Sequence, residues 1–118
     1  MTIQEVADSF FQLSQEGKWS EIQNELFAQD AQSIEPPTSQ GLKSAQGLDA
    51  IKKKGEAWNN MVQEVHGGYS GKPQIAGNHF SVPMGVDVTL KGAGRSKMDE
   101  IAVYEVKDGK IVKEQFFF

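Results

Sequence analysis

The chain has 118 residues, the length of a single domain, and its 12 basic and 16 acidic side chains give a net charge of −4. This acidic balance argues against nucleic acid or an anionic membrane as a partner, because proteins that bind them carry a basic patch. Since the sequence contains no cysteine, no signal-peptide pattern and no apolar run of about 20 residues, we expect a cytoplasmic protein without disulfides or membrane spans.

The first predicted helix follows from apolar side chains spaced three and four residues apart, namely Ile3, Val6, Phe10 and Leu13. Thr2 and Glu5 fit a capping box at its start, and Gly17 fits a left-handed stop at its end. A second helix is expected to begin near Lys18, and its inner face should carry Trp19, Ile22 and Leu26.

Residues 30–35 are predicted to form a short strand, which Pro36 and Pro37 must end because neither has an N–H to donate. The loop 38–47, rich in Ser, Gln and Gly, has room for one short strand. A third helix is predicted by another apolar stripe: Leu48, Ile51, Gly55, Trp58 and Val62. The lysines at 52–54 fall mostly opposite this stripe, which favours a solvated face, with an anion site as the alternative.

Apolar side chains alternate with other residues from residue 64 onward, which is typical of half-buried strands. The long strand 80–90 contains Pro83, which implies an edge position or a bulge. Strands 97–106 and 111–118 follow, joined by the hairpin turn Asp108-Gly109. Helices followed by antiparallel hairpins predict an α+β domain, in which three N-terminal helices pack on one face of a strongly curved, mainly antiparallel sheet.

Four titratable side chains are candidates for catalysis, because their neighbours suggest burial: Glu35, Asp99, Glu114 and His66. Asp99 points inward if Ile101 and Val103 form the buried face of its strand. It points outward if the alternate set does: Met98, Ala102, Tyr104 and Val106.

The other three candidates also have structural alternatives. Glu114 shares its parity with Phe116, and the opposite register would turn it outward. Glu35 could be an exposed strand end, and His66 a structural histidine with satisfied hydrogen bonds. No metal site is expected, because His-x-x-x-His and cysteine pairs are both missing from the sequence.

The order of elements resembles the cone-shaped α+β fold of nuclear transport factor two, ketosteroid isomerase and the SnoaL-like polyketide cyclases. The likeness is strongest in residues 25–31 (ELFAQDA), before and within the first strand, and in residues 98–118, the final hairpin. It covers nearly the whole chain, so residues 1–118 are identified as one SnoaL-like domain. The fold itself serves both enzymes and binding modules.

The resemblance implies roles for three positions. Glu35 before Pro36 matches the general base of the isomerases, and Asp99 after Met98 matches their oxyanion donor. Phe10 stands where these isomerases have a tyrosine, and phenylalanine cannot donate a hydrogen bond. Half of the oxyanion site is therefore missing, which argues against a steroid isomerase of the usual type.

The resemblance also implies a cone-shaped apolar pocket lined by Phe10, Trp58, Met61, Phe80, Val82, Met84, Ile101, Val103 and Phe116. In such a pocket two carboxyl groups could act as base and proton donor on a small hydrophobic carbonyl compound, with no cofactor. This reading makes the chain an isomerase or cyclase. The alternative is a ligand-binding or dimerisation module in which aromatic side chains fill the cone.

A homodimer is expected through the outer face of the sheet, the face that the helices leave bare. Alternation predicts that this face carries Ser81, Gly85, Asp87, Thr89, Ala102, Tyr104, Val106, Ile111 and Phe117. The family that the chain resembles commonly dimerises through the same face.

Overall fold

The computed structural model describes residues 1–39 and 41–118, and within them it contains three helices and seven strands. The helices are α1 (Ile3–Gln15), α2 (Trp19–Leu26) and α3 (Leu48–Met61). The strands are β1 (Phe27–Ile34), β2 (Ala45–Gln46), β3 (Val62–Ser70), β4 (Gln74–Ala76), β5 (His79–Leu90), β6 (Gly94–Lys107) and β7 (Lys110–Phe117). Gln40, inside the predicted loop 38–47, lies outside the described residues.

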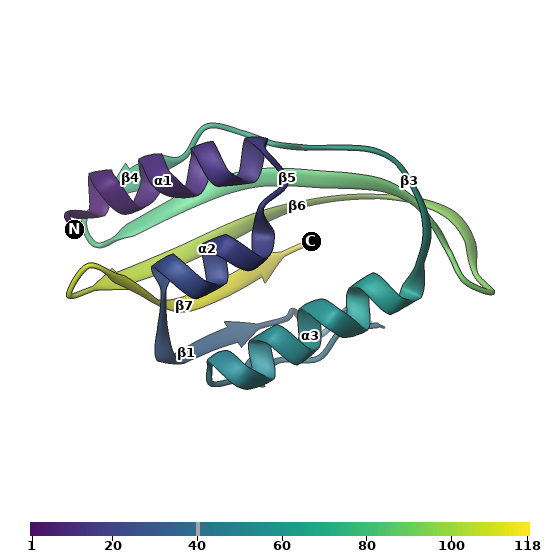
Figure 1. Cartoon of the computed structure of the whole chain (residues 1–118). Coiled ribbons are helices and arrows are strands. Elements are labelled where there is room, and N and C mark those ends of the chain that lie inside the picture. The colour runs from purple at the N-terminus through teal and green to yellow at the C-terminus, as the bar shows by residue number, and fades with distance from the viewer. Residues whose placement is uncertain (40) are drawn as a thin grey trace.

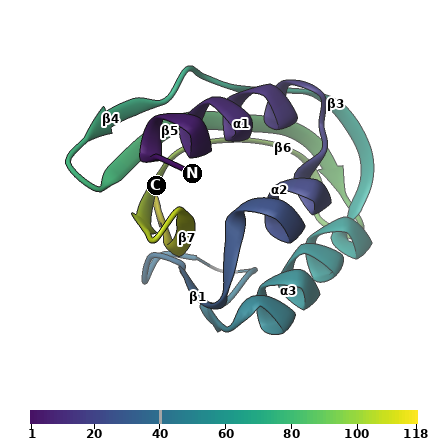
Figure 2. The ribbon, with the colours of Figure 1, turned by 60° about the vertical axis from the view of Figure 1, so that its left-hand side comes forward.

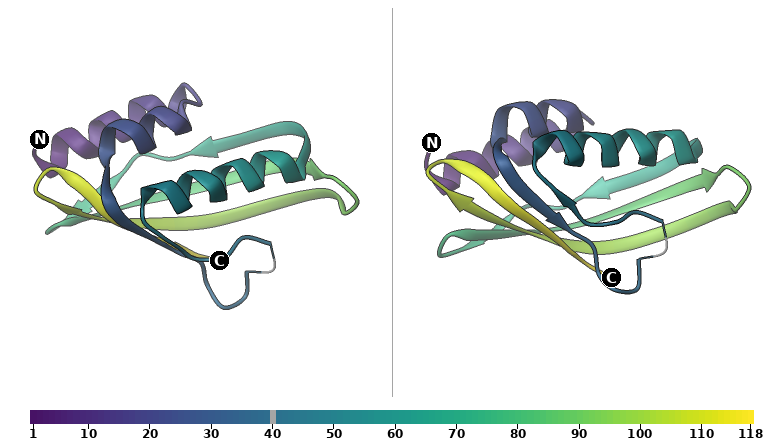
Figure 3. Two further views of the ribbon diagram at one scale, coloured as in Figure 1. Left: turned by 60° about the horizontal axis from the view of Figure 1, so that its bottom comes forward. Right: turned by 90° about the horizontal axis from the view of Figure 1, so that it is seen from below.

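The strands form one curved sheet that does not close, in the order β2-β1-β7-β6-β5-β3, with β4 paired to β5. Only the β1–β7 pairing is parallel among the described strands, so the sheet is mainly antiparallel. All three helices lie on the same side of this sheet (Figures 1 and 3), and the strands curve around them (Figure 2). The predicted α+β architecture is confirmed.

The start and end of α1 follow from local chemistry. The Glu5 backbone N–H donates to Thr2 Oγ1 at 3.2 Å, and the Thr2 N–H donates to Glu5 Oε1 at 2.9 Å, which confirms the capping box. Gly17 has a φ of 70°, a left-handed conformation that ends the helix. No helix of the described residues is long and apolar enough to cross a membrane.

The inner face of the long β5–β6 hairpin carries even-numbered side chains. Phe80 pairs with Tyr104, and Val82 pairs with Ala102; all four are buried. The rings of Phe80 and Tyr104 stack at 5.0 Å, and Phe10 of α1 lies 4.7 Å from Tyr104. These aromatic side chains fill the space between α1 and the sheet.

The pairing register of β5 with β6 contradicts the predicted location of several side chains. Ala102, Tyr104, Val106 and Ile111 are core residues at 7% exposure or less, and do not lie on the outer face. In strand β6 the even-numbered set is the buried one, because it meets the apolar even-numbered set of β5 across the hairpin. Trp19, expected on the inner face of α2, is 43% exposed, although its ring touches Phe10 at 6.0 Å.

Candidate functional site

A buried ion pair lies where α3 crosses the end of β1. The Lys54 ammonium is 2.6 Å from Glu35 Oε2, and these two side chains are only 10% and 8% exposed. The same ammonium donates to Ser33 Oγ at 2.7 Å and lies 5.0 Å from the centre of the Phe116 ring. Lys54 is therefore held on three sides by a carboxylate, a hydroxyl group and an aromatic face.

Ser33 connects this ion pair to the last strand. Its hydroxyl accepts from Lys54 and donates to Glu114 Oε1 at 2.6 Å. The parallel pairing of β1 with β7 sets Ser33 beside Glu114, and the pairing of β6 with β7 sets Tyr104 beside it on the other side. Tyr104 is a second hydrogen-bond partner of the Glu114 carboxyl group.

Burial controls the protonation of Glu114. It raises the pKa of this carboxyl group, and the nearby Glu35 charge raises it further, while Ser33, Lys54 and Tyr104 act to lower it. Burial also raises the pKa of Tyr104 well above its ordinary value, with Glu114 as the next cause.

Glu100 is the third carboxyl group on this side of the sheet. It lies on β6 opposite Met84 of β5, which packs against the core, and it remains half-buried. Partial burial raises its pKa to about 7, with smaller contributions from the charges of Glu35 and Glu114, while Lys54 opposes the shift. We call the five groups Ser33, Glu35, Lys54, Glu100 and Glu114 the inner cluster.

The structure brings together two of the four predicted catalytic residues. Glu35 and Glu114 are both in the inner cluster, joined through Lys54 and Ser33. Asp99 is not: it is exposed on the outer face, where its carboxylate accepts a hydrogen bond from the Tyr69 hydroxyl at 2.7 Å. The prediction that Asp99 points inward is wrong, because in β6 the buried parity belongs to Glu100, Ala102 and Tyr104.

His66 is also separate from the inner cluster. Its Nε2 atom lies 2.7 Å from Thr89 Oγ1 of β5, and its Nδ1 atom lies 3.3 Å from Glu64 Oε2. A β-bulge between Val65 and Gly67 sets its position in β3. Thr89 belongs to the odd-numbered side of β5, opposite to the side that faces the helices.

The residues predicted to line one pocket lie on two different faces of the sheet, the face toward the helices and the outer face. Phe10, Phe80 and Val82 are buried in the core, and Met84 and Phe116 pack against it. Trp58 and Met61 of α3 are half-buried. Ile101 and Val103 are wrong predictions: Ile101 is 50% exposed, and both share the outer parity of Asp99.

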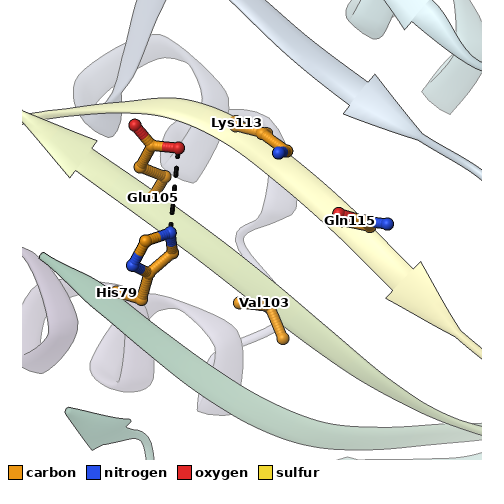
Figure 4. Close-up of a pocket in the computed structure, with 5 residues that line it drawn as sticks. All are labelled: His79, Val103, Glu105, Lys113 and Gln115. Carbon is orange, nitrogen blue, oxygen red and sulfur yellow. Dashed lines mark ion pairs between the residues drawn. The ribbon is translucent and has the colours of Figure 1, made fainter. Parts of the chain in front are cut away.

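Val103 instead helps to line a small depression on the outer face of about 50 Å³ (Figure 4). His79 Nε2 lies 3.7 Å from Glu105 Oε1 there, with Lys113 and Gln115 on the neighbouring strand. This space is much smaller than the roughly 300–1,000 Å³ of a small-molecule site.

The sequence reasoning missed three members of the inner cluster: Ser33, Lys54 and Glu100. A signal existed for Lys54, which stands three residues after Ile51 and four before Trp58, on the apolar stripe of its helix. Ser33 and Glu100 could be found only from strand register. Within the described residues no group of three His, Asp or Glu side chains is arranged to hold a metal ion.

The family model described as a SnoaL-like domain matches residues 1–118. A solved structure from Mesorhizobium loti, assigned to the SnoaL-like polyketide cyclases and carrying the added label carbohydrate phosphatase, is 34% identical, with all of both chains covered and a TM-score of 0.91. No protein with a curated function matches the sequence.

More distant structures share the fold alone. An NTF2-like protein from Burkholderia pseudomallei is 15% identical at a TM-score of 0.77, over 100% of this chain and 92% of that one. TerC, co-crystallised with polyporic acid, is 17% identical at a TM-score of 0.74, over 98% of this chain and 90% of the other.

Proposed function

Because the chain belongs to the SnoaL-like domain family, we propose that it is a small-molecule enzyme that moves a proton next to a carbonyl group, with Glu100 as its acid and base. The observation that carries this proposal is the inner cluster itself: three carboxyl groups and one ammonium gathered on the side of the sheet that faces the helices. This chemistry needs only proton transfer, so we expect no cofactor.

Glu100 is the group best suited to the proton transfer. A pKa of about 7 leaves it divided between acid and base near neutral pH, which is the optimal range for general acid–base catalysis. Its carboxylate would take a proton from the carbon beside the carbonyl, and the resulting acid would return that proton to a different carbon. The C–H electron pair passes into the enolate during the first step. Where the enolate is conjugated with a second double bond, the π pair of that double bond forms the new C–H bond at its far carbon in the second step.

The remaining groups would act as a fixed charged support. Lys54 sets Glu35 in one position, and it also brings positive charge toward the site where the enolate oxygen would develop. Ser33 and Tyr104 fix the Glu114 carboxyl group from two sides. A small hydrophobic carbonyl compound would be the substrate, bound beside the half-buried Trp58, Met84 and Phe116.

The test is deuterium exchange next to the carbonyl of small cyclic and aryl ketones in D₂O, followed by proton NMR. We expect the Glu100→Gln variant to lose at least about 100-fold of the exchange rate. Asp99→Asn is the matched control, since it makes the same change one residue away on the outer face, and it should retain the wild-type rate. Equal losses in both variants would contradict the proposal.

A non-catalytic ligand-binding or dimerisation module of the same fold is the second candidate. The packed rings of Phe10, Phe80 and Tyr104 favour the dimerisation role, because they occupy space that a substrate or ligand would need. Wild-type protein that exchanges no faster than Glu100→Gln would support a non-catalytic module over the enzyme. Binding of one of the ketones would then identify a ligand-binding module, and no binding would identify a dimerisation module.

We also propose that the protein is a homodimer that pairs through the outer sheet face. Ile101 and Phe117 lie side by side on β6 and β7 and are 50% and 49% exposed, and Val103 extends this apolar row. Burial of the row in a twofold contact would remove it from water. Ile101→Lys with Phe117→Lys should give a folded monomer by light scattering, whereas Val65→Lys, at another exposed apolar position, should not.

A further inference from the structure

A groove separate from the outer-face depression runs between α3 and the segment before it. The segment 41–46 forms one wall, and Ala50, Lys53, Lys54 and Ala57 of α3 form the other. The open space is about 440 Å³, within the range of small-molecule sites. We call this feature the lysine groove.

Small side chains make the groove. Ala50 and Ala57 are seven residues apart on α3, so they lie two turns apart on one helix face, and both side chains end at Cβ. On the facing wall, Gly41 and Ala45 are equally small and leave the groove open. Leu42 adds a half-buried apolar side chain, so the surface between the lysines suits an apolar group.

The charge of the groove has one sign. Lys43, Lys53 and Lys54 line it, and no carboxylate is among its described lining residues, in a chain whose net charge is −4. The Lys54 ammonium is already bound by Glu35 and Ser33. Lys43 and Lys53 are exposed and have no ion-pair partner among the described residues, so their charge is available to a ligand.

We propose that the lysine groove binds a small organic carboxylate, with its anionic group between Lys43 and Lys53 and its apolar body along Ala50 and Ala57. Two flexible ammonium groups suit a single carboxylate, since lysine acts as a point charge without the fixed fork of arginine. The apolar floor distinguishes this ligand from an inorganic anion. The site does not depend on the proton transfer proposed above, although Lys54 belongs to both regions.

The test uses sodium benzoate as the probe and benzamide as its neutral counterpart, followed by amide NMR shifts of the full chain. We expect benzoate to shift residues 41–57 in a saturable way, and benzamide to bind at least about tenfold more weakly. The affinity for benzoate should fall as salt rises, because the lysine charges are exposed. Inorganic phosphate should bind no better than benzamide.

Paired variants then locate the site. Lys43→Gln with Lys53→Gln should weaken benzoate binding about tenfold, a loss of about 1.4 kcal/mol. Lys72→Gln with Lys107→Gln removes the same charge from exposed positions outside the groove and should leave binding unchanged. Glu100→Gln should also bind benzoate as wild type does, so a failure of the catalytic proposal and a failure of this one give different results.

Three results would overturn the proposal. One is the absence of saturable shifts in residues 41–57 at benzoate concentrations up to about 20 mM, which would fill even a millimolar site. Another is equal affinity for benzoate and benzamide. The third is an equal loss of binding in the two double variants, which would mean that only the net charge of the chain attracts the anion.

Discussion

Two ion pairs of similar geometry lie on opposite sides of the sheet and differ in their surroundings. Lys54 and Glu35 are 2.6 Å apart on the side that faces the helices, at 10% and 8% exposure. Arg95 and Asp87 are 2.9 Å apart on the outer side, at 60% and 19% exposure. Arg95 even makes two hydrogen bonds to its carboxylate, the arrangement that favours the outer pair on geometry alone.

The comparison shows that burial, and not contact geometry, determines how strongly the loss of one charged partner affects stability and the pKa values of neighbouring groups. Water screens the outer pair, so losing one partner leaves the other hydrated. In the inner cluster a lost partner leaves a charge with little access to water, and its neighbours shift their protonation in response. The Arg95 hydrogen bonds lower the pKa of Asp87, whereas burial, more than the neighbouring charges of Glu35 and Glu114, raises the pKa of Glu100.

The largest expected effect comes from Lys54→Met. This variant removes the ammonium but keeps most of the stem, and it leaves the Glu35 carboxylate buried without its counter-ion. We expect the free energy of unfolding to fall by about 3–5 kcal/mol in a urea melt. Lys53→Met is the matched control on the same helix, and because Lys53 is exposed it should change the stability by less than about 0.5 kcal/mol. Equal effects of the two variants would contradict a buried role for Lys54.

A smaller effect is expected from the protonation of Glu100. The folded protein binds this proton up to a pH of about 7, whereas the unfolded chain releases it near 4.5. Stability from this group is therefore fully present below about pH 4.5 and is lost as the pH rises through about 7. Glu100→Gln should match the wild-type Tm at pH 4 and exceed it at pH 8. A constant difference between these two pH values would mean that Glu100 titrates normally.

The smallest effect is expected at the outer pair. Arg95→Gln should leave the urea midpoint within experimental error of the wild type, because both partners remain hydrated. Its visible consequence should be local: carbon-13 NMR should show the pKa of Asp87 returning toward its ordinary value, since the Arg95 hydrogen bonds are the main cause of the lowering. A loss of stability comparable to that of Lys54→Met would remove the distinction between the two pairs.

The spacing of apolar side chains along the sequence was sufficient to predict the architecture, but it was insufficient to predict which residues form the candidate site. The helix stripes, the Thr2–Glu5 capping box and the strand alternation are local patterns, and the helices and strands β5, β6 and β7 formed close to the predicted residues. Strand β1 begins earlier than predicted, at Phe27, and ends at Ile34, so that Glu35 follows it. Asp99 and Glu100 are neighbours, and only the pairing of β6 with β5 and β7 decides which of them faces the helices. A shift of one residue in strand pairing exchanges the side chains on the two faces of a strand. When a strand has apolar side chains at both odd- and even-numbered positions, its sequence does not determine which set is buried.

The parallel pairing of β1 with β7 has a kinetic consequence. The Ser33–Glu114 hydrogen bond joins residues 81 positions apart, whereas Lys54 and Ser33 are 21 apart. Long-range closure of this kind costs more chain entropy than hairpin or helix formation, and it slows folding. We therefore expect the helices and the β5–β6 hairpin to form early and the inner cluster to assemble late, when β7 docks beside β1. A chain still emerging from the ribosome would have most of its secondary structure before it has its candidate site.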